Sequence, residues 1–154
     1  MASVNDVRHA LAGNLTHRVG AVAVYGDVNS GPFNFGVRYV DALSKFNAAD
    51  LNTNGTVALG AGNGAQPWAV DGTVGYNYNY WNKDQNLYVG YQATGDAARL
   101  GLPKNRVLVG LNVDMWKNTV LGAEYTHDNG YRQSLGGTGQ SSNTFGVRAG
   151  VKLG

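Results

Sequence analysis

The chain has 154 residues, 23 of them glycine and none cysteine, with 14% charged residues and a formal net charge of +2. This length suits one domain, and the small net charge argues against a nucleic-acid-binding protein. The lack of cysteine excludes thiol catalysis, thiolate metal sites and disulfides. No run of residues approaches the roughly 18 apolar residues of a membrane helix. We therefore treat residues 1–154 as a single domain.

Taken in chain order, apolar and polar residues alternate in about eight segments. An alternation with a period of two predicts β-strands that have one apolar face. The predicted strands are residues 3–11, 15–28, 33–42, 68–81, 85–94, 106–116, 119–127 and 143–153, with a weaker piece at 56–61. No segment with helical periodicity competes with them, so the sequence predicts an all-β protein.

The connections between the predicted strands alternate in length from Val28 onward. Short connections are expected at 29–32, 82–84 and 117–118, and long ones at 43–67, 95–105 and 128–142. Outer-membrane barrels have tight periplasmic turns and longer external loops. The order predicts an antiparallel up-and-down transmembrane β-barrel of about eight strands. The tight 12–14 tip of the first hairpin is the exception.

Each predicted strand has an apolar and a polar side. For the 15–28 segment we expect Val19, Ala21, Ala23 and Tyr25 on the apolar side. The polar side is expected to line a lumen with Arg18, Arg38, Asp71, Asn112, Asp114, Glu124, Arg148 and Lys152. A soluble, lipocalin-like barrel would instead fill its interior with the apolar side, whereas a membrane barrel turns that side toward lipid.

Aromatic residues concentrate near the ends of the predicted strands, at the two levels where a bilayer's interfaces would lie. The expected aromatic girdle is Trp68, Tyr76, Tyr78, Tyr80, Tyr91, Trp116, Tyr125 and Phe145, and we also expect Tyr88 near the short turns. This distribution favours the membrane arrangement, with a lipid bilayer as partner and the bacterial outer membrane as location. The opening MASVNDVRHA does not have the pattern of a signal peptide.

Several stretches resemble the C-terminal part of the LbtU family of outer-membrane, porin-like proteins associated with siderophore uptake. They include DALSKFNAADL (41–51), GNGAQPWAVDGTVGYNYNYW (62–81), VGYQATGDAARLGLPKNRVLVG (89–110) and GGTGQSSNTFGVRAGVKL (136–153). The resemblance implies a transport barrel for a ferric siderophore or a small anionic solute. Family members are longer, with more strands, and the resemblance implies a pore wider than eight strands would form.

Two further functions stay open at this point. The predicted lumen is mildly basic, which suits anions in a conducting barrel. Because eight strands leave room only for side chains or one small ligand, the alternative is a small non-conducting barrel that acts as a membrane scaffold or through its extracellular loops. A soluble binding barrel is the third interpretation.

Residues that could support catalysis or metal binding are sparse. The histidines His9, His17 and His127 are widely spaced, without the close pairs that typify metal sites. His127 and Asp128 with Ser134, Ser141 or Ser142 could be imagined as a hydrolase triad, but no serine lies in a recognisable motif. The sequence therefore predicts a non-enzymatic protein with no metal or cofactor, most simply a monomer.

Overall fold

The computed structural model describes residues 19–46 and 64–151, and the predicted strand at 3–11 and the piece at 56–61 lie outside these ranges. The described residues form an all-β protein with one antiparallel sheet of seven strands in sequence order. The strands are β1 (Ala21–Ser30), β2 (Phe33–Ala42), β3 (Trp68–Tyr80), β4 (Lys83–Gly95), β5 (Asn105–Trp116), β6 (Thr119–Asn129) and β7 (Ser141–Val151). This confirms the all-β, antiparallel part of the prediction. The sheet is not closed among these strands: β1 pairs only with β2, and β7 only with β6.

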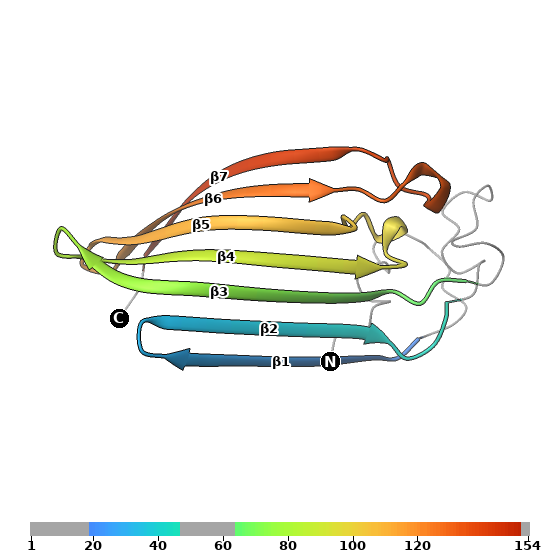
Figure 1. Cartoon of the computed structure of the whole chain (residues 1–154), viewed down its shortest axis with the longest axis horizontal. Helices are drawn as coiled ribbons and strands as arrows, with labels where there is room; N and C mark the ends of the chain where they lie inside the picture. The colour runs from blue at the N-terminus through green and yellow to red at the C-terminus, as the bar shows by residue number, and fades with distance from the viewer. Residues whose placement is uncertain (1–18, 47–63, 152–154) are drawn as a thin grey trace.

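The connections differ at the two ends of the sheet, as the sequence predicted. Two-residue turns join β1 to β2, β3 to β4 and β5 to β6 at the left of Figure 1, and the longer connections lie at the right. The β3–β4 turn consists of Trp81 and Asn82, both with positive φ, rather than residues 82–84. The β1–β2 turn consists of Gly31 and Pro32, a shorter turn than the predicted 29–32. Two short 3-10 helices, η1 (Ala98–Leu100) and η2 (Gln133–Leu135), belong to the long connections.

The few buried apolar side chains lie at the long-loop end of the sheet. Val19, Ala42, Phe46 and Ala65 form one cluster, where the backbone N–H of Phe46 donates to the carbonyl of Ala65. Tyr131 and Ala97 are buried between the next loops. The large apolar side chains of the strands themselves are mostly exposed. Among the residues that the structure describes, no packed core covers either face of the sheet, although one would be expected for a sheet of a soluble protein.

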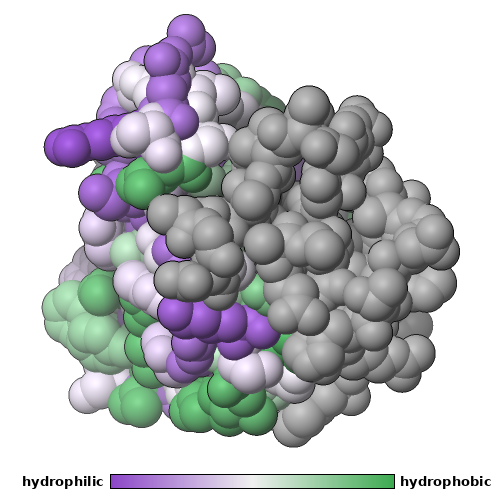
Figure 2. All heavy atoms as spheres, turned by 90° about the vertical axis from the view of Figure 1, so that its right-hand side faces the viewer, coloured by the Kyte–Doolittle hydropathy of each residue, from purple (hydrophilic) through white to green (hydrophobic). Residues whose placement is uncertain are grey.

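Strand register assigns each residue to a face, because directly paired residues project to the same side of a sheet. One side, the apolar face, carries Phe35, Val37, Val74, Leu87, Val89, Val107, Val109 and Val147. The opposite side, the polar face, carries the charged residues described below. Seen from the long-loop end, hydrophobic residues collect along the lower-left margin, and hydrophilic residues lie nearer the middle and at the top (Figure 2).

The register corrects the expected apolar side of β1. Val24 pairs with Tyr39 and Val28 with Phe35, so Val22, Val24 and Val28 lie on the apolar face. Ala21, Ala23 and Tyr25 lie on the polar face instead, with Tyr25 directly opposite Arg38. The segment AVAV is apolar at successive positions, so alternation alone did not settle its orientation, and the pairing with β2 does.

Among the described residues, no helix is long and apolar enough to cross a membrane.

Candidate functional site

The predicted lumen residues that the structure describes all lie on the polar face: Arg38, Asp71, Asn112, Asp114, Glu124 and Arg148. Arg18 and Lys152 lie outside the described residues. The polar face is organised as rows of directly paired residues that cross the sheet. Each row brings together side chains that are far apart in the sequence.

The first row, the arginine row, consists of Arg38, Asp71, Gln92, Arg106 and Asp128 on five successive strands. The Gln92 amide donates to Asp71 at 3.4 Å. Arg106 donates from Nε to Asp128 Oδ1 at 2.6 Å and from Nη2 to Oδ2 at 2.8 Å. This two-bond geometry is the strong form of an arginine–carboxylate pair.

A second row contains Tyr88, Gly110 and Glu124 on β4, β5 and β6. The Tyr88 hydroxyl reaches across Gly110 and donates to Glu124 Oε2 at 2.7 Å. A Cβ at Gly110 would overlap the Tyr88 ring, so glycine makes this crossing possible. The expectation that Tyr88 belongs with the girdle aromatics near the short turns is therefore wrong, because its register position places it on the polar face.

A third row contains Asn77, Asn86, Asn112, Gly122 and Arg148. Asn86 Nδ2 donates to Asn77 Oδ1 at 2.7 Å, and Arg148 Nη2 reaches over Gly122 to Asn112 Oδ1 at 2.9 Å. In this part of the chain, the polar face thus satisfies many of its own side chains by cross-strand hydrogen bonds.

Among the described residues, carboxylates outnumber basic groups on the polar face. Arg18 and Lys152, two of the four basic residues of the expected lining, lie outside the described residues, so the mildly basic lining stays a prediction. The described part of the face carries three guanidinium groups, Arg38, Arg106 and Arg148, against the carboxylates Asp27, Asp71, Asp84, Asp114, Glu124 and Asp128. The sequence analysis counted neither Asp27 nor Asp84 as lining residues, and only the register shows that both face this side.

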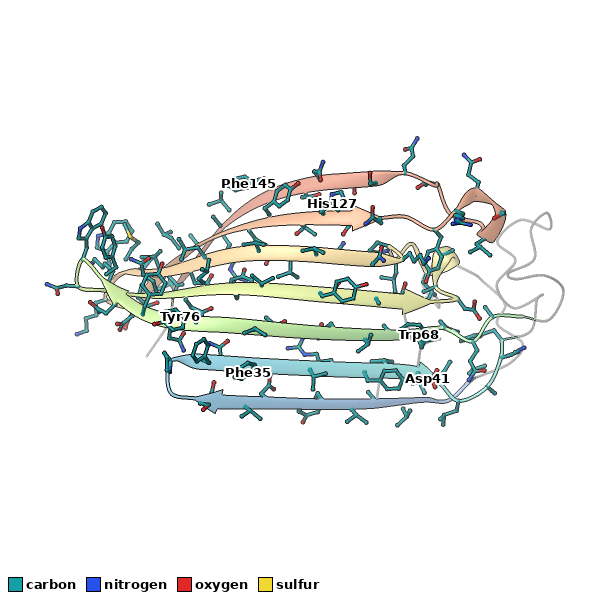
Figure 3. The ribbon with its side chains drawn as sticks, viewed as in Figure 1. Phe35, Asp41, Trp68, Tyr76, His127 and Phe145 are labelled. Atoms are coloured by element: carbon teal, nitrogen blue, oxygen red, sulfur yellow. The ribbon has the colours of Figure 1, made fainter. Side chains whose placement is uncertain are left out.

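The predicted girdle residues lie on the apolar face: Trp68, Tyr76, Tyr78, Tyr80, Tyr91, Trp116, Tyr125 and Phe145. Trp116 reaches this face because a register shift between Asp114 and Trp116 pairs it with Thr119. Near the short turns, the ring centroids of Phe33 and Tyr76 are 5.1 Å apart. Tyr76 and Phe35 lie toward the short turns and Trp68 at the other end, beside Asp41 (Figure 3).

At the long-loop end of the polar face there is a cavity of about 400 Å³, which we call the rim hollow. Arg106 and Asp128 contribute the strand side of its lining. Its other walls come from the β4–β5 and β6–β7 connections and the start of β7, through Leu102, Pro103, Tyr131, Thr138, Gln140, Ser141 and Ser142.

Tyr131 holds the two loops of the rim hollow together. Its side chain is buried, and its hydroxyl lies 2.6 Å from Thr94 Oγ1 at the end of β4. Thr94 Oγ1 also donates to the Pro103 carbonyl at 2.7 Å. The backbone adds Lys104 N–H to the Asn129 carbonyl at 2.8 Å. These bonds give the rim hollow a defined shape.

Asp128 lies at the end of β6, beyond the girdle residue Tyr125 and next to the loop. The hydrogen bonds from Arg106 hold the pKa of Asp128 below its ordinary value, and the positive charge of Arg106 acts in the same direction. Partial burial of the carboxylate opposes this shift. Asp128 is therefore charged whenever the sheet is folded near neutral pH, so the rim hollow contains an intact ion pair.

The hydrolase arrangement considered for His127 and Asp128 is not formed. Consecutive strand residues project to opposite faces, and the pairing of His127 with Val107 places it on the apolar face. His127 lies near the end of β6 (Figure 3), and its Nδ1 is 2.6 Å from Asn143 Oδ1. Within the described ranges, no three histidine, cysteine or acidic side chains lie close enough to hold a metal ion. His9 and His17 lie outside those ranges.

Sequence reasoning missed the Arg106–Asp128 pair and the role of Tyr131. The pair had a signal: extending the alternation of Asn112 and Asp114 back along 106–116 places Arg106 on the same face, and extending that of Glu124 forward reaches Asp128. Tyr131 had none, because it belongs to a loop whose position depends on contacts with β4.

Comparison with known proteins gives relatives for this chain but no family model that matches it. A UPF0422 protein of Coxiella burnetii is 35% identical over 125 residues, which cover 81% of this chain and 25% of that protein. UPF0422 proteins of Legionella pneumophila strains Lens and Paris are 32% identical over 146 residues, covering 85% of this chain and 26% of each. The chain thus spans about a quarter of the length of these curated relatives. No solved structure matches it significantly.

Proposed function

We propose that this chain forms the wall of a porin-like β-barrel in a bacterial outer membrane, with the apolar face toward lipid and the polar face around an aqueous lumen. One observation carries the proposal. Large side chains such as Val74, Val89, Val109 and Phe145 are exposed over the whole apolar face, while the opposite face holds hydrogen-bonded charged residues. In water this arrangement leaves the hydrophobic side without a partner, whereas a bilayer supplies one.

The dimensions of the sheet support the same proposal. The strands are 10 to 13 residues long, and a tilted strand needs about 9 to 11 residues to cross the hydrocarbon core. Two-residue turns at one end and longer connections at the other follow the pattern of periplasmic turns and external loops. The girdle aromatics near both ends fit the two interfaces.

Closure of the barrel is part of the proposal. In lipid, every backbone N–H and C=O group needs a partner, so an open edge is not tolerated. In this meander β1 and β7 run in the same direction, because seven antiparallel strands separate into four of one direction and three of the other. A fully antiparallel barrel therefore needs an odd number of additional strands, and eight is the smallest total. In this proposal, any additional strand would come from outside the described residues.

The resemblance to siderophore-uptake proteins supports a transport role, and the greater length of the curated relatives is compatible with a wider barrel. Among the described residues, the polar face carries more carboxylates than basic groups. This charge balance favours a neutral or cationic solute over a strongly anionic ferric siderophore.

The test begins with the full chain refolded in a detergent. Migration on a gel that changes with heating is expected, because a folded barrel is compact and resists the gel detergent. In planar bilayers we expect discrete conductance steps. A chain that migrates as a folded barrel but gives no current would support the non-conducting scaffold instead. A chain that stays monomeric and folded in buffer without detergent would contradict both membrane functions.

A further inference from the structure

The rim hollow is a formed cavity rather than a gap between mobile loops. Its volume of about 400 Å³ falls at the lower end of the range for small-molecule sites, roughly 300 to 1,000 Å³. The Tyr131 hydroxyl and the Thr94 hydroxyl join the two loops that enclose it. Gly137 lies so close to the Tyr131 backbone that a Cβ there would overlap it, which fixes the β6–β7 loop against this tyrosine.

The lining offers hydrogen-bonding groups that the protein itself leaves available. Arg106 uses Nε and Nη2 to hold Asp128, and among the described residues no hydrogen bond engages its Nη1 group. The same holds for the hydroxyl of Ser142, which is directly paired with Asp128 and lines the hollow beside the ion pair. A hydroxyl both donates and accepts, and a guanidinium donates through a planar fork.

The charge of the hollow restricts its ligand. Arg106 and Asp128 cancel each other, and among the side chains that the structure describes no other charged group lines the cavity. Among the described residues, the polar face below it carries more carboxylates than basic groups, which disfavours an anion on its way into the proposed lumen. Leu102 and Pro103 add an apolar patch at the edge. A ring that has adjacent hydroxyls around its rim and C–H groups on its faces matches both kinds of lining.

The geometry points to the rim hollow as a binding site for a small uncharged polyhydroxylated solute, of the size of one or two sugar rings. The adjacent hydroxyls of the solute accept from Arg106 Nη1 and donate to Asp128, and the Ser142 hydroxyl binds a third hydroxyl. This inference rests on the proposed function, since it names the solute class that the mouth of the proposed lumen takes up first.

The test uses the full chain refolded in a detergent without a sugar headgroup, titrated calorimetrically with maltose and, separately, with citrate. Saturable binding of maltose and weaker or absent binding of citrate are expected. Ser142→Ala and Arg106→Lys should each weaken maltose binding about threefold to tenfold, the loss expected for one hydrogen bond. Ser30→Ala is the matched control, because Ser30 is exposed at the opposite end of the sheet and should leave binding unchanged.

Three results would overturn the inference: no saturable maltose binding by protein that migrates as a folded barrel, tighter binding of citrate than of maltose, or equal losses in Ser142→Ala and Ser30→Ala. The bilayer measurement separates this inference from the proposed function. A conducting barrel that does not bind maltose would keep the porin proposal and remove the solute class. Maltose binding by a chain that is soluble without detergent would keep the solute class and remove the porin proposal.

Discussion

At the scale of single residues, the polar face depends on glycines over which longer side chains cross. Gly110 lies under the Tyr88 ring and Gly122 under the Arg148 side chain. In each case the crossing side chain reaches a hydrogen-bond partner one strand further on, Glu124 and Asn112 respectively. Glycine therefore lowers the local β-propensity of the strand, but it leaves room for a cross-strand contact.

The Tyr88–Glu124 contact gives a prediction with an internal control. Gly110→Ala forces the Tyr88 ring aside and breaks its hydrogen bond to a carboxylate, so we expect a loss of about 1–2 kcal/mol in the free energy of unfolding. Gly146→Ala adds the same methyl group on the same face where no atom lies within 4 Å, and should be neutral or slightly stabilising. Denaturant unfolding in detergent, followed by tryptophan fluorescence, measures both. Equal effects of the two substitutions would contradict the role given to Tyr88.

The Asp128 carboxylate gives a pH-dependent prediction. Its pKa is lower in the folded than in the unfolded chain, so its contribution to stability is fully present above the unfolded value of about 3.9 and is lost as the pH falls through the lower, folded value. We expect Asp128→Asn to be less stable than the unsubstituted chain at pH 7, by about 1 kcal/mol because the pair is partly exposed.

The same comparison at low pH provides the check. Once Asp128 is protonated in the unsubstituted chain, the two proteins should differ little, so the difference between their unfolding midpoints should shrink as the pH falls below the ordinary value of an aspartate carboxyl. Asp96→Asn serves as the control, since the pKa of Asp128 depends on Arg106 and not on the β4–β5 loop carboxylate. A difference that stays constant from pH 7 to pH 3 would show that Asp128 does not act through its charge.

At the scale of secondary-structure elements, the β3–β4 hairpin carries an unusual turn. Trp81 and Asn82 have φ of 55° and 54°, as a type I′ turn requires. Asparagine tolerates this conformation, whereas a bulky residue costs roughly 1–2 kcal/mol in it. Trp81 is nevertheless 82% exposed, with its ring stacked on Tyr80. If the short turns lie at a bilayer interface, as we propose, an interfacial tryptophan would explain why such a residue occupies this turn.

Trp81→Asn should therefore change stability in a direction that depends on the surroundings. In lipid vesicles we expect the free energy of unfolding to fall, because the bilayer interface loses an aromatic anchor. If the turn faced only water, the substitution would relieve backbone strain and raise stability by ~1 kcal/mol. Unfolding of the vesicle-inserted chain, followed by the fluorescence of the remaining tryptophans, gives the sign. A stabilised variant would contradict the placement of the short turns at an interface.

The elements also show how far sequence reasoning reached. Alternation predicted seven of the strands close to their observed positions and the side of every described lumen and girdle residue except Trp116, because period-two patterns over ten residues are hard to produce by chance. It failed where the pattern is ambiguous or interrupted: in AVAV of β1, both sides are apolar, and at Met115 a register shift turns Trp116 to the apolar face. Loop contacts such as Tyr131 with Thr94 carry no periodic signal.

At the scale of the whole molecule, the distribution of charge along the polar face decides what the proposed lumen prefers. Toward the long-loop end, Arg106 pairs with Asp128, and Arg38 lies directly opposite Asp71. Toward the short turns, Asp84 and Asp114 line a cavity of about 490 Å³ together with asparagine, glutamine and tyrosine side chains and no basic residue. A pore with carboxylates near one end favours cations.

The last prediction concerns ion preference in planar bilayers with a potassium chloride gradient. The reversal potential should show that potassium permeates more readily than chloride, because the carboxylates of the polar face concentrate cations in the lumen. The double substitution Asp84→Asn and Asp114→Asn should move the permeability ratio toward one, by roughly twofold or more, and high salt should weaken the effect by screening. Asp41→Asn removes a carboxylate from the apolar face, outside the proposed lumen, and should leave the ratio unchanged. A chloride-selective current would instead show that basic residues dominate the conduction path. It would contradict the assignment of these carboxylates to the lumen.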